Sequence, residues 1–109
     1  LNNWYPREVL EDERYTEKYV DILAARARQA FFEYMPIRPV ERDPNRVYRK
    51  YSLGPLAEVF VIDQRSYRGP NSPNRQETLD GAAAMLGPPQ LEWLKTSLAQ
   101  STALWKIIA

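Results

Sequence analysis

Leu53-Gly54-Pro55-Leu56-Ala57-Glu58-Val59-Phe60-Val61-Ile62-Asp63 is the stretch of sequence that decides the fold. Its second part, residues 57–63, is a continuous β-branched and aromatic run, which predicts a strand buried on both faces. The preceding residues 53–56 contain Gly and Pro and predict a turn. Residues 46–52 alternate between two sets of side chains with a period of two, as a strand does. The economical interpretation is a β-hairpin.

A helix precedes this hairpin. Between residues 16 and 34, apolar side chains recur at helical spacing, with charged side chains such as Arg28 on the opposite side. We expect Asp12 or Thr16 to cap its start, and Pro36 prevents the helix from continuing past Met35. The apolar face consists of Val20, Leu23, Ala24, Ala27, Ala30, Phe31 and Tyr34.

Turn-forming residues dominate the segment after the hairpin. Residues 64–89 are rich in Gly, Pro, Asn and Ser and predict a long loop, which in a compact chain is usually functional or disordered. Residues 90–101 then carry apolar side chains at helical spacing, and residues 105–109 predict a strand. The order helix, β-hairpin, long loop, helix, strand places the chain in the α/β or α+β class.

The composition is that of one small globular domain, and it limits the available chemistry. With 109 residues and a net charge of +1, the chain lacks the basic excess of a general nucleic-acid binder. It contains no cysteine and no histidine. Within this chain, that excludes thiol chemistry, Ser-His-Asp catalysis and a His-rich zinc site. The polar side chains that remain available for a functional site are carboxylates, amides, tyrosines and arginines.

Arginine and asparagine are the residue types most suited to a site here. Eleven basic residues are arginines and four are lysines, and six of the arginines lie between residues 35 and 68. A guanidinium holds carboxylate or phosphate through two parallel hydrogen bonds, although each arginine also suits a surface salt bridge. Asn2 and Asn3 offer amide oxygens of the kind that hard cations bind, although such pairs also suit turns and caps.

Both ends of the chain look interrupted. The sequence begins at Leu1 without a methionine, and its last residues, 105–109, read as the start of a buried strand. Natural termini tend to be polar and loosely held, so we expect a chain that is truncated at both ends. It carries no signal peptide, and no apolar run approaches the roughly 20 residues that span a bilayer.

Five blocks of sequence carry a more specific signal. They are Asn2-Asn3-Trp4-Tyr5-Pro6; Ala30-Phe31-Phe32-Glu33-Tyr34-Met35-Pro36-Ile37-Arg38; Val47-Tyr48-Arg49 with Leu53-Gly54-Pro55-Leu56-Ala57-Glu58; Asp63-Gln64-Arg65-Ser66-Tyr67-Arg68; and Met85-Leu86-Gly87-Pro88-Pro89-Gln90-Leu91-Glu92-Trp93-Leu94 with Ser101-Thr102-Ala103-Leu104-Trp105-Lys106. In order and content, these blocks resemble the alkaline phosphatase D (PhoD-like) family of metallophosphoesterases. They cover nearly the whole chain.

The resemblance implies a metallophosphoesterase-type β-sandwich flanked by helices, of which residues 1–109 are a single segment. It implies hydrolysis of phosphomonoesters and phosphodiesters by a metal-activated water, with calcium and iron, or other divalent ions, as the metals. It also implies export, as a secreted, periplasmic or cell-surface enzyme. The partners are then a phosphate-ester substrate and the missing segments of the parent domain, with no specific nucleic-acid partner and no transmembrane segment.

Carried over position by position, the resemblance implies roles for four residues. Asn2 or Asn3 occupies the place of a metal-ligand asparagine, and the sequence does not decide between them. Arg38 is the first choice for a phosphate contact, and Arg65 is the second. No residue of this chain is assigned to catalysis.

Structural roles compete with these functional ones. The other interpretation of Arg38 is a buried ion pair with Glu33 or Asp63. We expect Arg49, Arg68 and Asp63 itself to brace the hairpin and the loop rather than to touch substrate.

The missing family segments limit what this chain can do. The Asp-Asp-His-Glu run that precedes the asparagine pair in the family is absent, so we expect the piece to be inactive alone. Trp93 and Trp105 are most simply core residues. Nevertheless, we expect marginal stability, with Phe60, Ile62, Trp105 and Ile107 exposed where sheet partners are lost.

Two interpretations from other functional classes remain open. One is a free-standing, arginine-rich anion- or nucleic-acid-binding α+β module built around residues 38–68, without catalysis. It would explain the absent ligands without truncation, but a net charge near zero counts against it. The other is a structural domain whose exposed aromatic side chains dock a partner.

Overall fold

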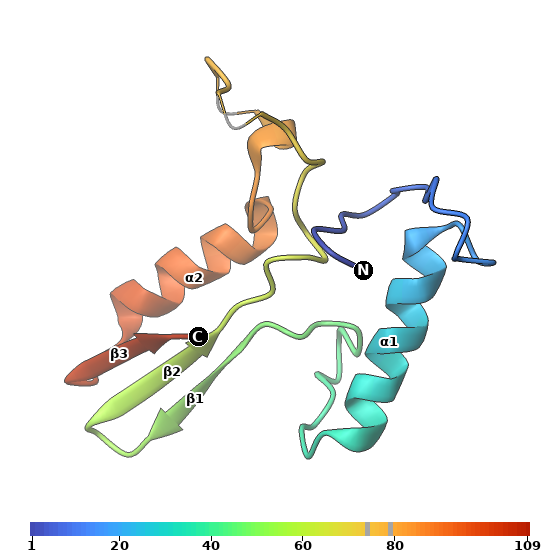
Figure 1. The fold of residues 1–109 in the computed structure, drawn as a ribbon. Coiled ribbons are helices and arrows are strands. Elements are labelled where there is room, and N and C mark those ends of the chain that lie inside the picture. Colours follow the sequence, from blue (N-terminus) through green and yellow to red (C-terminus); the bar gives the residue numbers. More distant parts are fainter. Residues whose placement is uncertain (74, 79) are drawn as a thin grey trace.

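The computed structural model describes residues 1–73, 75–78 and 80–109, which form helices and a small mixed sheet (Figure 1). The elements are α1 (Val20–Tyr34), β1 (Arg49–Leu53), β2 (Ala57–Val61), the short 3-10 helix η1 (Gly81–Ala83), α2 (Pro88–Gln100) and β3 (Trp105–Ile108). The predicted order of helix, β-hairpin, long loop, helix and strand is confirmed, and the chain is α/β. The predicted loop of residues 64–89 contains η1, ends where α2 begins at Pro88, and includes residues 74 and 79, which lie outside the described residues.

The three strands have the order β1–β2–β3. β1 and β2 form the predicted antiparallel hairpin, in which Tyr51 lies opposite Val59. β3 pairs with β2 in parallel, so that Ile107 lies on the other side of Val59. Gly54 allows the tight hairpin turn because its φ of 63° lies in the left-handed region that other residues rarely adopt. The parallel connection runs through the long loop and α2, as parallel strands require.

The two hairpin strands are shorter than predicted. β1 begins at Arg49 rather than at residue 46, and β2 ends at Val61 rather than at residue 63. The Arg49 side chain explains the first difference, since it takes the carbonyl groups of Arg46 and Val47 away from strand pairing. Gln90 explains the second, because its amide pairs with the main chain of Asp63.

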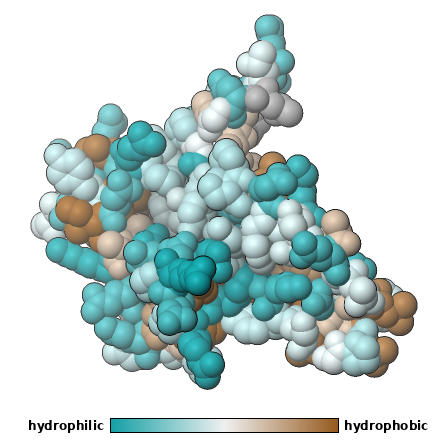
Figure 2. Space-filling model, turned by 180° about the vertical axis from the view of Figure 1, so that it is seen from behind, coloured by the Kyte–Doolittle hydropathy of each residue, from teal (hydrophilic) through white to brown (hydrophobic). Residues whose placement is uncertain are grey.

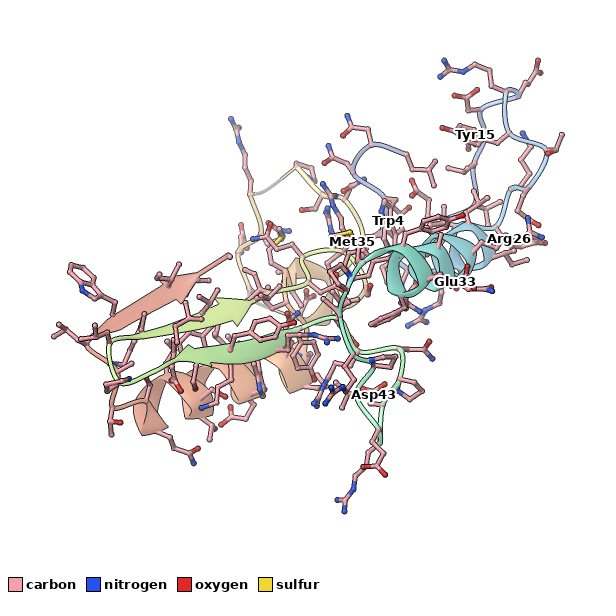
Figure 3. The ribbon with its side chains drawn as sticks, turned by 90° about the horizontal axis from the view of Figure 1, so that it is seen from below. Trp4, Tyr15, Arg26, Glu33, Met35 and Asp43 are labelled. Atoms are coloured by element: carbon pink, nitrogen blue, oxygen red, sulfur yellow. The ribbon has the colours of Figure 1, made fainter. Side chains whose placement is uncertain are left out.

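One face of the sheet packs against α2 and forms the core (Figures 1 and 3). Phe60 is fully buried in this layer, together with Tyr48 and Leu94. Trp93 of α2 is half-buried and packs on Tyr48, with 4.9 Å between the ring centroids. The prediction that Phe60 is exposed is therefore wrong, because α2 covers this face of β2. Ile62, also predicted to be exposed, is half-buried.

The opposite face of the sheet carries no covering layer among the described residues (Figure 3). Val59 is half-buried there, and on the flanking strands Tyr51, Trp105 and Ile107 are 42%, 67% and 47% exposed. The predicted exposure of Trp105 and Ile107 is confirmed, and Trp105 is not a core residue of this chain. The prediction that residues 57–63 are buried on both faces is wrong, since α2 covers only one.

The chain is more open than an independent domain of its size. Its accessible surface is 8441 Å², whereas a folded protein of this mass exposes about 6,200 Å². Its radius of gyration is 16.2 Å, against about 13 Å for a compact domain of this length.

Apolar side chains also gather at the end of the sheet where β1 turns into β2 (Figure 2), namely Leu53, Leu56 and Leu104.

Helix α1 stands beside the sheet rather than on it (Figures 1 and 3). It begins at Val20 and not at residue 16, because the preceding segment pairs with itself: the N–H of Leu10 donates to Lys18, and that of Val20 to Glu8. The predicted cap by Asp12 or Thr16 is wrong, since the residue before the helix makes no side-chain cap. No helix in the described part of the chain is long and apolar enough to cross a membrane.

Candidate functional site

The carboxyl ends of the parallel strands β2 and β3 meet at one edge of the sheet. There the N–H of Ile62 donates to the carbonyl of Ala109 at 2.8 Å. Loops that follow parallel strands at this edge are where α/β proteins place functional side chains. The turn of residues 63–66 follows β2 at this edge, so its side chains are candidates for a functional site.

Asp63 organises this turn. Its Oδ1 accepts the main-chain N–H groups of Arg65 and Ser66, both at 2.9 Å. The carboxylate therefore has a structural task, and its predicted role as a brace is confirmed. The fully buried Gln90 of α2 holds the main chain of Asp63 from the other side.

Arg65 and Asn3, two of the four predicted site residues, lie together. Nη2 of Arg65 donates to Oδ1 of Asn3 at 3.2 Å, and Nδ2 of Asn71 donates to the Asn3 carbonyl at 2.9 Å. Asn3 has a φ of 51°, a conformation that asparagine tolerates better than most residues. Nη1 of Arg65 is buried and has no hydrogen-bond partner among the described residues. Asn2, the other predicted ligand, is exposed, as is Asn3.

Arg38 lies outside this group. It is exposed, and its contribution to the local structure is a main-chain carbonyl that accepts from Nη1 of Arg49 at 2.6 Å. Its predicted alternative, an ion pair with Glu33 or Asp63, does not form among the described residues. Glu33 instead accepts from the amide of Gln29 at 2.8 Å.

Two further arginines brace the hairpin and the loop, as predicted. Arg49 donates to three carbonyl groups, two of them just before β1, and its guanidinium lies 5.8 Å from the Phe32 ring. Arg68 donates to the Gly69 carbonyl at 3.2 Å and to Oδ1 of Asn71 at 2.6 Å. Two arginines of the stretch of residues 38–68 therefore already hydrogen-bond to other groups of the fold. This weakens the interpretation of the stretch as a free anion-binding surface.

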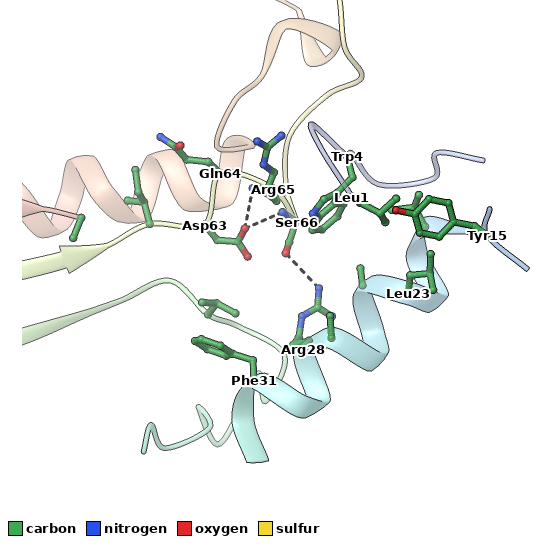
Figure 4. Close-up of a pocket in the computed structure, with 16 residues that line it drawn as sticks. Leu1, Trp4, Tyr15, Leu23, Arg28, Phe31, Asp63, Gln64, Arg65 and Ser66 are labelled. Carbon is green, nitrogen blue, oxygen red and sulfur yellow. Dashed lines mark hydrogen bonds between the residues drawn. The ribbon is translucent and has the colours of Figure 1, made fainter. Parts of the chain in front are cut away.

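A cavity of about 790 Å³ lies between α1, the N-terminal segment and the turn of residues 63–66 (Figure 4). Arg28 reaches from α1 across it and donates to Oγ of Ser66 at 3.3 Å, whereas the Arg65 guanidinium turns away from α1. Sequence reasoning missed Arg28, because a charged residue on the polar side of a helix is normally solvated. The apolar wall is formed by Trp4, Val20, Leu23, Ala24, Ala27 and Phe31.

Tyr67 follows this turn and is electrostatically perturbed. Burial raises the pKa of its phenol, and the nearby carboxylate of Asp43 raises it further. The ring packs edge-on against Tyr48, with 5.4 Å between centroids. Tyr67 is therefore a neutral packing residue at physiological pH.

The residues present do not form a metal site by themselves. The described part of the chain contains no group of three or more acidic, His or Cys side chains that could hold an ion. Asn3 offers one amide oxygen, which already accepts a hydrogen bond from Arg65. A stable site for a hard cation needs several further oxygen ligands, which the described residues do not provide here.

Comparisons with known proteins agree on one family. The profile described as PhoD-like phosphatase matches residues 1–109. Alkaline phosphatase D of Bacillus subtilis (strain 168) is 33% identical over 119 residues, which is 100% of this chain and 20% of that protein. A solved structure described as "Structure of PhoD" superimposes with a TM-score of 0.68 at 30% identity, covering 98% of this chain and 22% of the other. The chain thus spans about a fifth of the length of these relatives.

Proposed function

The chain belongs to the PhoD-like phosphatases, and on that premise we propose that residues 1–109 are one segment of a larger phosphoesterase that hydrolyses phosphate mono- and diesters. The segment supplies one edge of the active site and is inactive alone. Membership of this family supports a hydrolase, and the coverage of about a fifth of each relative supports a segment. The apolar sheet face, open in this chain, would then be covered by the rest of the domain.

The observation that carries this proposal is the pairing of Arg65 with Asn3. An arginine at the carboxyl edge of a parallel strand pair, with one buried nitrogen that has no hydrogen-bond partner in the described part of the chain, is suited to bind an anion. Phosphate oxygens accept two parallel hydrogen bonds from a guanidinium, which would satisfy this nitrogen. Such a contact also stabilises the charge that builds on the oxygens during hydrolysis.

Arg65 is accordingly the first proposed phosphate contact, and Arg38 becomes the second. Arg65 is held by Asp63 of its own turn and by Asn3 of the N-terminal segment, whereas Arg38 is exposed and apart from them. Asn3 is favoured over Asn2 as the proposed metal ligand for the same reason, since its position is held by both Arg65 and Asn71.

The proposed reaction class is metal-assisted hydrolysis, in which bound ions supply an activated water. Calcium and iron remain the proposed metals, and export from the cytoplasm the proposed location, on the family resemblance alone. Because the described residues cannot hold an ion without further ligands, no step at the metal is assigned to this chain. Its own residues orient the ester and neutralise phosphate charge.

The full-length protein and the 109-residue chain should be assayed side by side with bis-p-nitrophenyl phosphate and p-nitrophenyl phosphate, with added Ca²⁺ and iron. We expect turnover by the full-length protein, loss of turnover after chelation, and none by the chain alone. Turnover by the isolated chain would contradict the incomplete site. A metal-loaded full-length protein that hydrolyses neither ester would contradict the proposed function itself.

A further inference from the structure

Gln90 is a polar side chain in an apolar setting. It is fully buried, in the first turn of α2, under the same face of the sheet as Phe60. Burying an amide without partners is costly, so such a side chain persists only where its hydrogen bonds are made. Its partners therefore indicate what it does.

All of the described bonds of Gln90 go to the main chain. Oε1 accepts the N–H of Asp63 at 2.7 Å, and Nε2 donates to the carbonyl of Asp63 at 2.8 Å. Nε2 also donates to the Leu86 carbonyl at 3.0 Å. The amide thus pairs with Asp63 as a neighbouring strand would, two residues beyond Val61, where strand pairing to β1 ends.

The held residue is the one that builds the turn. The Asp63 carboxylate accepts the N–H groups of Arg65 and Ser66, and the Arg65 guanidinium in turn reaches Asn3. A displacement of the Asp63 main chain would move these groups together. Gln90 itself has no described contact with Arg65 or Asn3, so it acts on them only through Asp63.

We propose that Gln90 is a positioning residue of the phosphate site: it fixes the main chain of Asp63 and thereby places the Arg65 guanidinium for the ester. This inference rests on the proposed function, because it assigns Gln90 to the same site. Neither the family resemblance nor the comparisons assign a role to this position. Misplacing a catalytic group by about 1 Å from a distance can lower the rate about 10²-fold.

The Gln90→Glu variant of the full-length protein provides the sharpest test. An ionised carboxylate can accept from the Asp63 N–H but would repel the two carbonyl oxygens that face Nε2. Burial and these carbonyls both favour the neutral acid, so the pKa of the introduced carboxyl is raised. Once protonated, it again offers one donor and one acceptor to Asp63.

The measured quantity is the ratio of kcat/KM between variant and wild type as a function of pH. We expect this ratio to fall about 10²-fold at high pH and to recover as the pH drops from about 9 to about 6. The Gln90→Leu variant cannot regain either bond, so its ratio should stay low and flat. A constant ratio for Gln90→Glu, with the fold intact by circular dichroism, would overturn the proposal.

A double-variant cycle separates positioning from general stability. If Gln90 acts through Arg65, Gln90→Leu should add less than about twofold to the loss already caused by Arg65→Ala. The control is Leu94→Ala, which removes a buried apolar side chain from the same helix and should weaken the fold without this coupling. Full additivity of Gln90→Leu and Arg65→Ala would overturn the inference.

These outcomes are separable from a failure of the proposed function. If the wild type hydrolyses no ester, or if Arg65→Ala is fully active, the phosphate site itself is wrong. If wild-type turnover and the Arg65 effect are both observed but the pH-dependent ratio is absent, only the role of Gln90 is wrong. Inhibition by inorganic phosphate gives a second readout, since misplacing Arg65 should raise its inhibition constant in parallel with KM.

Discussion

Arg65 donates to the side chain of Asn3 across 62 positions of sequence, at 3.2 Å. This contact joins the N-terminal segment to the turn after β2 and brings the proposed phosphate contact next to the proposed metal ligand. Their proximity supports placing the two proposed roles in one site, because a guanidinium can neutralise phosphate charge beside bound ions. It is also the part of the site that is most directly testable.

Replacing Arg65 should impair catalysis strongly. Arg65→Ala removes a charge-assisted, two-pronged contact, and we expect kcat/KM of the full-length protein to fall about 10²–10³-fold. Arg65→Lys should recover only part of this loss, because an ammonium group is a point charge without the planar fork. Steady-state kinetics with a phosphodiester gives the measurement.

Arg38 and Arg26 serve as comparisons for Arg65. Arg26 is an exposed residue of α1, and Arg26→Ala should leave kcat/KM unchanged. Arg38→Ala tests the second proposed contact and should have the smaller effect of the two proposed contacts. If Arg38→Ala costs more activity than Arg65→Ala, the order of the two contacts is reversed.

Asn3 should matter for metal binding, and Asn2 should not. Removing the amide with Asn3→Ala should weaken metal binding by the full-length protein by at least about 10-fold. Asn2→Ala is the matched control, since it removes the adjacent amide, which is exposed like that of Asn3. Metal content after dialysis, measured by mass spectrometry, distinguishes them. Equal loss in both variants would mean that the asparagine pair acts as a unit and that the assignment to Asn3 is wrong.

Gly87 is required by its backbone and by its neighbour. It precedes α2 with φ 71° and ψ 152°, a region that is essentially restricted to glycine, and a Cβ there would lie 2.6 Å from the carbonyl oxygen of Tyr67. Gly87→Ala should therefore destabilise the fold by at least about 1–3 kcal/mol. Gly81→Ala, where a Cβ meets nothing within 4 Å, is the control. Similar urea midpoints for both variants would contradict this explanation.

The sequence predicted the elements well because their patterns are local. The alternation before Gly54 and the β-branched run after it indicate a hairpin whatever surrounds them, and the structure has that hairpin. Burial was harder to predict. Phe60 was expected to be exposed for lack of sheet partners, but it is covered by α2, which lies far along the chain. The local sequence pattern of a strand does not predict which of its faces a distant helix will cover.

The sequence predicted which types of residue form the candidate site, but it did not predict which of those residues lie together. Asn3 and Arg65 were singled out from family blocks, but nothing in either block indicates that the two side chains meet. Gln90 was missed because a glutamine in a helix is normally solvated. Its role depends on a strand end that the helix reaches only after the chain has folded.

Because of Glu58, the stability of the fold should decrease as the pH falls into the acidic range. The hydroxyl groups of Ser101 and Ser52 lower the pKa of its carboxyl below the ordinary value, against the opposing effect of burial, and the Lys50 ammonium lowers it further. Oε1 accepts from the Ser52 hydroxyl at 2.8 Å and from Lys50 at 3.4 Å. A carboxyl whose pKa is lowered by folding stabilises the fold when it is ionised.

The lowered pKa of Glu58 determines in which direction the pH changes the stability of the fold. The stabilisation by Glu58 is fully present above the ordinary pKa of an unfolded-state glutamate and is lost as the pH falls through the lower folded-state pKa. Glu58→Gln should therefore lower the urea midpoint at neutral pH, and the difference from wild type should shrink as the pH falls below about 4. Glu92→Gln is the control, because Glu92 pairs with Lys95 on the exposed surface and should change the midpoint little at any pH. A Glu58→Gln difference that stays constant from neutral to acidic pH would show that the loss comes from packing and not from the ionised carboxylate.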